Sequence, residues 1–242
     1  MSSGFTVRFS GLDIGIETQY EFMRAFCRDY VTEGRPCFTV RTDDAAVYRQ
    51  MAMAEEPTTP EYAEALQLYR EIAERLPLYD RAVFHGAAIE YGGKAYLFTG
   101  PSGIGKTTHI SLWRQYLGQR VQIINGDKPI LRKETSGITA CGTPYAGKEG
   151  WHRNASAPLA GICLLSQSKE NTVDLLRPEE VFSRLYQQIY KPKGEAALVK
   201  TIEIVRHLSA LPCWALGCNI SEEAVKTAFE ALTGTKYGEK TK

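Results

Sequence analysis

One stretch of the chain carries residue types at a spacing that suits phosphate chemistry. Residues 100–107 read Gly-Pro-Ser-Gly-Ile-Gly-Lys-Thr and match the pattern GxxxxGK[ST] at every defined position. Glycines let backbone N–H groups turn inward around phosphate oxygens, and the helix that follows presents its positive N-terminal end. We therefore expect a nucleotide to be bound by Gly100, Pro101, Ser102, Gly103, Ile104, Gly105, Lys106, Thr107 and Thr108.

Two side chains of this motif have specific expected roles. Lys106 would reach the β- and γ-phosphates, and the hydroxyl of Thr107 would bind Mg²⁺. The cofactors that the motif implies are therefore ATP and Mg²⁺, although nothing in these residues separates ATP from GTP. The alternative is a glycine turn that merely contains Lys-Thr. An apolar strand before the loop and an amphipathic helix after it favour the phosphate loop.

Such a loop needs an acidic group at the end of a neighbouring strand. Asp127 directly follows the apolar segment 121–124 and the pair Asn125-Gly126, and it is the only carboxylate of that region so placed. A lone Asp after a strand is commonly a turn residue. Beside a phosphate loop, we interpret Asp127 as a metal ligand or as the base that accepts the proton of an attacking hydroxyl.

Two further cations lie downstream, and their interpretation stays open. Lys148 belongs to the glycine-punctuated segment 142–149, which predicts either a surface hairpin or a lid over the phosphates. Arg153 follows Trp151-His152 and would stabilise charge on a transferring phosphoryl group. The alternative is a solvated loop anchored by Trp151. We include Lys148 and Arg153 among the candidate nucleotide-binding residues.

The elements that must position these residues are visible in the hydrophobic pattern. Residues 5–9 and 12–17 alternate around Ser10-Gly11 and predict a hairpin, residues 37–41 predict a strand, and Thr59-Pro60 predicts the start of a helix. From residue 82 onward the pattern becomes strand, turn, strand, phosphate loop and helix. Further strands and helices are expected at residues 121–124, 162–165, 172–176, 178–190, 195–208, 214–216 and after Ser221.

This order of elements predicts an α/β protein whose sheet carries the phosphate loop. We divide it into a small N-terminal α+β segment at residues 1–80, a nucleotide-binding domain at residues 81–235 and a frayed tail at residues 236–242.

Three motifs agree in order and spacing with a known family. The stretch from His85-Gly86 through Tyr91-Gly92 to the phosphate loop resembles the catalytic domain of bacterial HPr kinase/phosphorylase. The segments 103–108 and 123–127 also look like the kinase loops of phosphoenolpyruvate carboxykinase, whose mixed α/β fold that family shares. The resemblance covers residues 80 to 170 well. Among HPr-kinase-like proteins, the shorter kinases that modify serine in ribosomally made peptides are closer in size.

The resemblance implies a phosphoryl transferase in which Lys106 and Thr107 hold phosphate and metal, Asp127 takes the acidic catalytic position and His85 lies beside the transferred phosphate. The residues alone favour another interpretation, in which His85 is a structural histidine whose hydrogen bonds are satisfied within a strand. The chain also departs from the family, because Lys128 stands where a second aspartate is expected and the later Glu-x-Arg-Gly signature is missing. HPr kinases form rings, so a homo-oligomer is one expectation.

The charge balance excludes some partners. The chain has 29 Lys and Arg against 28 Asp and Glu, which argues against a nucleic-acid or membrane-surface binder. Residues 94–153 nevertheless hold nine basic against three acidic residues, which suits a polyphosphate. No apolar run approaches the roughly 18 to 20 residues of a membrane span. We found no secretory signal, and six scattered cysteines without zinc spacing predict free thiols in the cytoplasm.

These observations together predict a Mg²⁺-dependent kinase that transfers the γ-phosphoryl group of ATP to a hydroxyl of a peptide, a protein or a small molecule. Serine or threonine is the expected acceptor, and the sequence does not identify it. The alternative is a nucleotide sensor or scaffold with reduced turnover. Carboxykinase chemistry ranks last because the cations that would bind a dicarboxylate are not evident.

Overall fold

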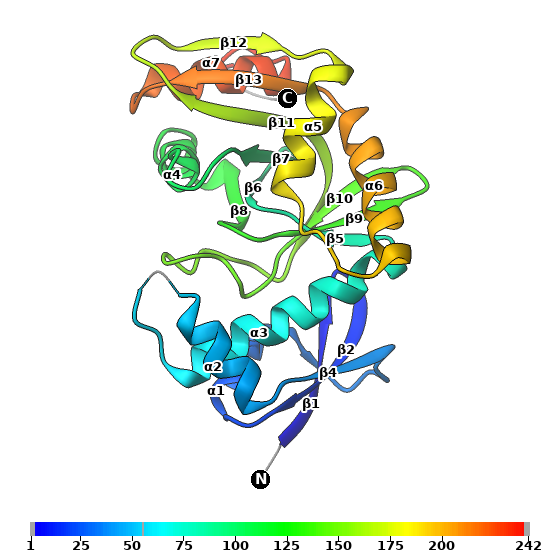
Figure 1. Ribbon diagram of the computed structural model, residues 1–242. Helices are drawn as coiled ribbons and strands as arrows, with labels where there is room; N and C mark the ends of the chain where they lie inside the picture. Colours follow the sequence, from blue (N-terminus) through cyan, green and yellow to red (C-terminus); the bar gives the residue numbers. More distant parts are fainter. Residues whose placement is uncertain (1–2, 55, 240–242) are drawn as a thin grey trace.

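The computed structural model describes residues 3–54 and 56–239 and shows two sheets with helices packed around them (Figure 1). The helices are α1 Phe22–Phe26, α2 Asp44–Ala52, α3 Pro60–Arg75, α4 Lys106–Leu117, α5 Pro178–Gln188, α6 Glu195–Ser209 and α7 Glu222–Thr233. The strands are β1 Ser3–Phe9, β2 Leu12–Thr18, β3 Val31–Thr32, β4 Phe38–Arg41, β5 Arg81–Val83, β6 Gly86–Tyr91, β7 Lys94–Thr99, β8 Val121–Asn125, β9 Ile130–Glu134, β10 Gly137–Cys141, β11 Ser156–Gln167, β12 Thr172–Leu175 and β13 Cys213–Cys218.

The N-terminal sheet has the strand order β3-β1-β2-β4. The predicted hairpin is confirmed: β1 and β2 are antiparallel, and both turn residues, Ser10 and Gly11, have positive φ angles of 54° and 76°. Strand β4 adds parallel to β2, which confirms the strand expected near residues 37–41. Helix α1 and strand β3 were not predicted, since segments this short carry little periodicity.

Helix α3 lies between the two sheets. It begins as predicted, because Pro60 occupies its first turn and the Thr59 side chain accepts a hydrogen bond from the N–H of Tyr62. Its buried residues join one hydrophobic cluster with the N-terminal sheet, and that cluster also takes in Ile130 and Tyr145 of the larger part. The N-terminal segment therefore packs directly on the sheet that carries the phosphate loop. The division at residue 80 stays a prediction.

The larger sheet is organised around the long strand β11. Its order is β5-β9-β10-β11-β7-β6-β8, with β13 also paired to β11 and β12 to β13. The first residues of β11 pair antiparallel with β10, and the later ones run parallel to both β7 and β13. We predicted only residues 162–165 as strand. Ala157, Pro158 and Gly161 have weak strand propensity, and pairing on both sides outweighs it.

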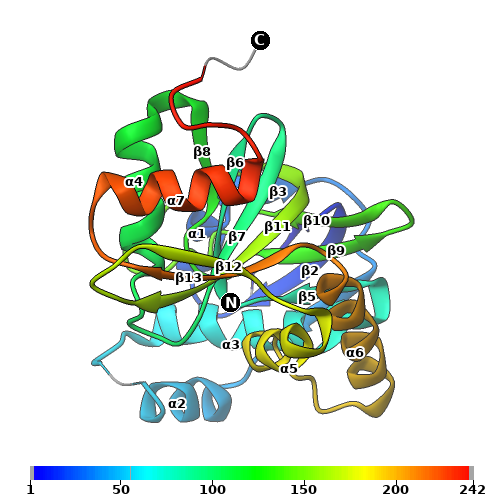
Figure 2. The same cartoon turned by 90° about the horizontal axis from the view of Figure 1, so that it is seen from above.

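Helices cover both faces of this sheet (Figure 2). Helices α4 and α7 pack on one face, where Trp113 and Phe229 belong to one buried cluster. Helices α5 and α6 pack on the opposite face, where Leu185 and Val205 belong to another. This architecture confirms the predicted mixed α/β fold class.

Three strand ends meet at one edge of the sheet. Strand β6 runs antiparallel to both β7 and β8, so that Gly86 pairs with Thr99 and Ala88 pairs with Asn125. The start of β6 therefore lies beside the ends of β7 and β8. His85, the phosphate loop and Asp127 follow from these ends and are brought to the same place.

No helix among the described residues is long and apolar enough to span a membrane. The six cysteines are all described, and each is a free thiol.

Burial of His109 in α4 should make stability depend on pH. The Nε2 atom of His109 accepts a hydrogen bond of 3.0 Å from Trp113, and burial lowers the pKa of the imidazole to about 4. Between pH 6.5 and pH 4 the folded state thus binds fewer protons than the unfolded state. The free energy of unfolding therefore decreases as the pH is lowered through this range. Urea unfolding should show wild type losing about 2 kcal/mol more than His109→Gln between pH 7 and pH 5. An equal loss of unfolding free energy in wild type and His109→Gln would contradict the burial of a neutral His109.

Candidate active site

The phosphate loop joins the end of β7 to the start of α4. Gly100, Gly103 and Gly105 have φ angles of +148°, +75° and +106°, in the region that other residues rarely adopt. A Cβ atom on Gly103 or Gly105 would meet nothing within 4 Å, so the backbone conformation rather than crowding requires glycine there. The loop lies directly ahead of a 12-residue helix, and phosphate binding by it stays a prediction.

Lys106 lies across this loop. Its side chain is largely buried, and its Nζ atom donates to the carbonyl oxygens of Gly100 and Pro101, each at 3.1 Å. Burial lowers the pKa of the ammonium group, the charge of Asp127 opposes that shift, and Lys128 adds to it. These carbonyl oxygens are weak partners compared with phosphate oxygens. Phosphate binding by Lys106 in place of these carbonyls stays a prediction.

Asp127 is held by the side chain of Asn125, which is fully buried at the end of β8. The Oδ1 atom of Asn125 accepts the backbone N–H groups of Asp127 at 2.9 Å and of Lys128 at 2.7 Å. This is an Asx turn, in which the side chain mimics a backbone carbonyl. The turn fixes the direction in which the Asp127 carboxylate leaves the strand.

The other end of the Asn125 amide binds a second loop. Its Nδ2 atom donates to the carbonyl and hydroxyl oxygens of Thr143, at 2.9 and 3.1 Å, and to the carbonyl of Tyr145 at 3.3 Å. The hydroxyls of Thr143 and Tyr69 both donate to the carbonyl of Lys128, at 3.0 and 2.9 Å. Sequence analysis missed Asn125. An Asn directly before Gly-Asp at a strand end was the available signal.

His85 faces Asp127 from the start of β6. Its Nε2 atom lies 3.6 Å from Oδ1 of Asp127, and its Nδ1 atom lies 3.2 Å from Oε1 of Gln188. Burial is the largest influence on the pKa of His85 and lowers it, and the charges of Lys106 and Lys128 lower it further. The charge of Asp127 and the contact with Gln188 act in the opposite direction, but the net shift is downward. The imidazole is therefore neutral near pH 7. Lys128 forms an ion pair with the other carboxylate oxygen of Asp127.

The structure brings Lys106, Asp127 and His85 together but gives the two downstream cations other contacts. Lys148 lies in an exposed ion pair of 2.6 Å with Glu56, and Arg153 donates to Gln122 at 3.1 Å. Neither contact reaches the phosphate loop. The loop that carries Lys148 does pass the site, since a Cβ on Gly147 would lie 3.2 Å from Cβ of Asp127. Nucleotide contact by Lys148 and Arg153 stays a prediction.

The residues present are suited to a magnesium ion. No group of three His, Cys, Asp or Glu side chains close enough to hold a metal exists within residues 3–54 and 56–239. Mg²⁺ does not need such a cage, because it is usually held by one or two carboxylates together with phosphate oxygens and water. The hydroxyl of Thr107 and the carboxylate of Asp127 are donors of that chemical kind, and their binding of Mg²⁺ stays a prediction.

Two cavities flank the site. One of about 400 Å³ lies against the phosphate loop and is lined by Gly103, Gly105 and Thr108 together with the ends of β11 and β13. The other, of about 420 Å³, begins at His85 and Lys128 and extends between α3 and the end of α5. His85 lines the second cavity, and the first is lined by the glycine loop that precedes Lys106.

No protein-family model and no curated protein matches the chain. Among solved structures, the chain is similar to the Hpr(Ser) kinase/phosphatase from Coxiella burnetii, with 12% sequence identity, a TM-score of 0.29, and coverage of 51% of this chain and 88% of that chain. At this TM-score the likeness is distant.

The charges around His85 give a direct test of the site. We expect Lys106→Met to raise the pKa of His85, because it removes a nearby positive charge, and Asp127→Asn to lower it further. NMR titration of the imidazole Cε1 proton measures both shifts. Lys94→Met, at the far end of β7, should change nothing. If the pKa of His85 did not change in these variants, or changed in the opposite direction, the proximity of Lys106, Asp127 and His85 would be contradicted.

Proposed function

We propose that this protein is a Mg²⁺-dependent kinase that transfers the γ-phosphoryl group of ATP to a hydroxyl group of an acceptor. The observation that supports this most is the placing of Lys106, Asp127 and His85 at one edge of the sheet, with Asp127 within 3.6 Å of His85 and electrostatically coupled to Lys106. A phosphate-binding loop alone would serve many nucleotide-binding proteins. A carboxylate and a neutral imidazole beside it favour a chemical step.

The loop and Lys106 would act by position and charge. The backbone N–H groups of Gly100 and of residues 102–107 would bind the phosphates, and the ammonium of Lys106 would stabilise the negative charge on the β- and γ-phosphates as the bond between them breaks. Mg²⁺, when bound through Thr107 and Asp127, neutralises charge on the same oxygens. We assign the nucleoside to the cavity of about 400 Å³ beside Gly103 and Thr108.

Asp127 would take the proton of the acceptor. The acceptor oxygen attacks the γ-phosphorus, its proton passes to the carboxylate of Asp127, and ADP leaves with the electrons of the broken P–O bond. Lys128 pairs with one carboxylate oxygen, which leaves the oxygen that faces His85 to accept the proton. The neutral His85 orients that oxygen and adds no charge to repel Lys106.

Substitution separates binding from chemistry. With radiolabelled ATP and a pool of acceptors from a cell extract, we expect Lys106→Ala to reduce labelling by at least about a thousandfold. Asp127→Asn should abolish labelling but leave most nucleotide binding, measured by calorimetry. Lys94→Ala and Asp174→Asn, both on exposed side chains away from the site, serve as matched controls. Full turnover in Asp127→Asn would contradict its role as the base.

The Lys128 ion pair favours a second candidate function, that of a nucleotide sensor with little turnover. An ammonium group on Asp127 competes with the metal for the same carboxylate. The sensor function would be supported if ATP with Mg²⁺ bound to the protein while no acceptor became labelled. Labelling of any acceptor that depends on Lys106 excludes it.

A further inference from the structure

A groove leads from the candidate catalytic groups along helix α3. Its inner part is the cavity of about 420 Å³ that begins at His85 and Lys128. Its outer part, of about 1020 Å³, lies over α2, α3 and the start of the segment after α5. Gln50, Arg70 and Tyr190 line both parts, so the two adjoin each other. Helices α2 and α3 lie side by side in both views (Figures 1 and 2).

The two parts of the groove differ in chemistry. The inner part is largely apolar and aromatic, with Leu66, Tyr69, Ala73, Val83 and Ile189 in its wall. The outer part is strongly charged. Its basic residues are Arg41, Arg49, Arg70, Arg75 and Lys193, and its acidic residues are Asp43, Glu71 and Glu74.

The carboxylates of the outer groove are already engaged by the protein. Asp43 accepts the N–H of Ala46 and caps α2, and Glu71 forms an ion pair of 3.0 Å with Arg75. Glu74 accepts the hydroxyl of Tyr190 and the backbone N–H of Lys193, both at 2.8 Å. Glu71 is therefore paired with Arg75, whereas Asp43 and Glu74 accept only neutral donors and keep their negative charges; with five basic and three acidic residues, the outer part is net positive.

Three arginines of the outer part have no ion-pair partner among the described residues. Across residues 3–54 and 56–239, the exposed side chains of Arg41, Arg49 and Arg70 make no ion pair and no side-chain hydrogen bond. A guanidinium group matches a carboxylate in charge and in geometry, because its two N–H groups can bind both oxygens. The outer groove is thus chemically suited to a ligand that carries several carboxylates.

We propose that this groove binds an acidic polypeptide segment whose serine or threonine hydroxyl reaches His85 and Asp127. The proposal rests on the kinase function proposed above and names its class of acceptor. A polypeptide fits better than a metabolite because the adjoining cavities of about 420 and about 1020 Å³ together exceed the usual 300 to 1,000 Å³ of a small-molecule site. The acceptor residue lies in the apolar inner part, and flanking Asp and Glu residues pair with Arg41, Arg49 and Arg70.

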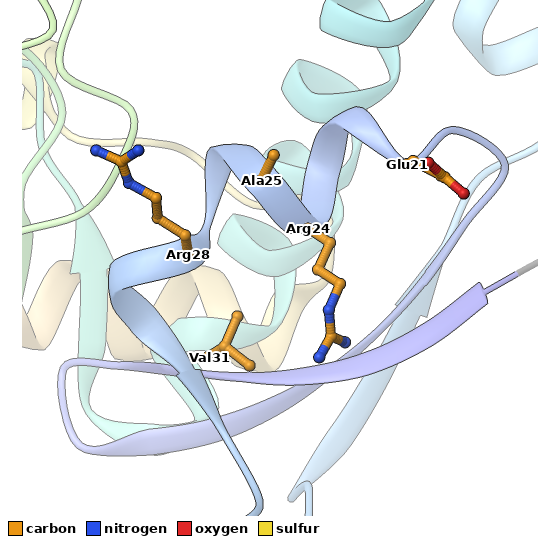
Figure 3. Close-up of a pocket in the computed structure, with 5 residues that line it drawn as sticks. All are labelled: Glu21, Arg24, Ala25, Arg28 and Val31. Atoms are coloured by element: carbon orange, nitrogen blue, oxygen red, sulfur yellow. The ribbon is translucent and has the colours of Figure 1, made fainter.

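A second basic pocket on the N-terminal segment provides a matched control (Figure 3). It has a volume of about 670 Å³ and is lined by Glu21, Arg24, Ala25, Arg28 and Val31. Arg24 lies over the ring of Phe5 at 5.5 Å and Arg28 pairs with Asp29 at 3.6 Å, so both are already partnered. None of its residues lines either part of the groove.

Peptide binding without nucleotide tests the groove independently of turnover. The probe is a fluorescein-labelled eight-residue peptide with one serine flanked by Asp and Glu, and its control replaces these with Asn and Gln. By anisotropy, the acidic peptide should bind at least about tenfold more tightly, and the triple variant R41Q/R49Q/R70Q should lose that preference. The double variant R24Q/R28Q should keep it. Equal binding of both peptides, or a preference kept by the triple variant, overturns the proposal.

Turnover separates a failure of the groove from a failure of the kinase function. With labelled ATP, the acidic peptide should be phosphorylated in preference to the neutral peptide and to free L-serine. The triple variant should raise KM for the peptide about tenfold and leave KM for ATP unchanged. Equal labelling of all three acceptors overturns the proposed binding of acidic peptides in the groove and supports the proposed kinase function. The opposite result is that the triple variant weakens binding of the acidic peptide while no acceptor is phosphorylated. That result supports peptide binding in the groove and overturns the proposed kinase function.

Discussion

The buried side chain of Asn125 holds together three segments that the rest of the site depends on. Its oxygen fixes the turn at Asp127 and Lys128, and its amide nitrogen ties down the loop through Thr143 and Tyr145. The carbonyl of Lys128 then accepts the hydroxyl of Tyr69 from helix α3. A buried amide with every hydrogen-bonding group satisfied is rigid, because any movement leaves a polar atom unpaired. The position of the Asp127 carboxylate follows from this network.

The electrostatics of the site follow from that position. Asp127 lies between the imidazole of His85 and the ammonium of Lys128, and it influences the pKa of Lys106 as well. Burial keeps His85 neutral, and two nearby lysines add to that effect. The site therefore places three basic groups around one carboxylate. Under the proposed function, that single carboxylate would serve both metal and proton.

Local signals were sufficient for much of this structure. The hairpin of β1 and β2 and the cap at Thr59 were predicted because each depends on residues close in the chain. The contact of His85 with Gln188 joins residues 103 positions apart, and local patterns do not report such contacts. The groove is a further example, since Arg41 and Arg70 come from separate elements. The length of β11 was missed because pairing with three neighbours, not propensity, makes it a strand.

Calorimetric titration of the protein with ATP, in the presence of Mg²⁺ and again in EDTA, tests the central claim most directly. We expect one ATP per chain, bound by the glycine loop in both conditions and more tightly with Mg²⁺, because Thr107 and Asp127 then contribute through the metal. Absence of ATP binding at millimolar nucleotide, or binding that Mg²⁺ leaves unchanged, would contradict the assignment of this edge of the sheet as a nucleotide site.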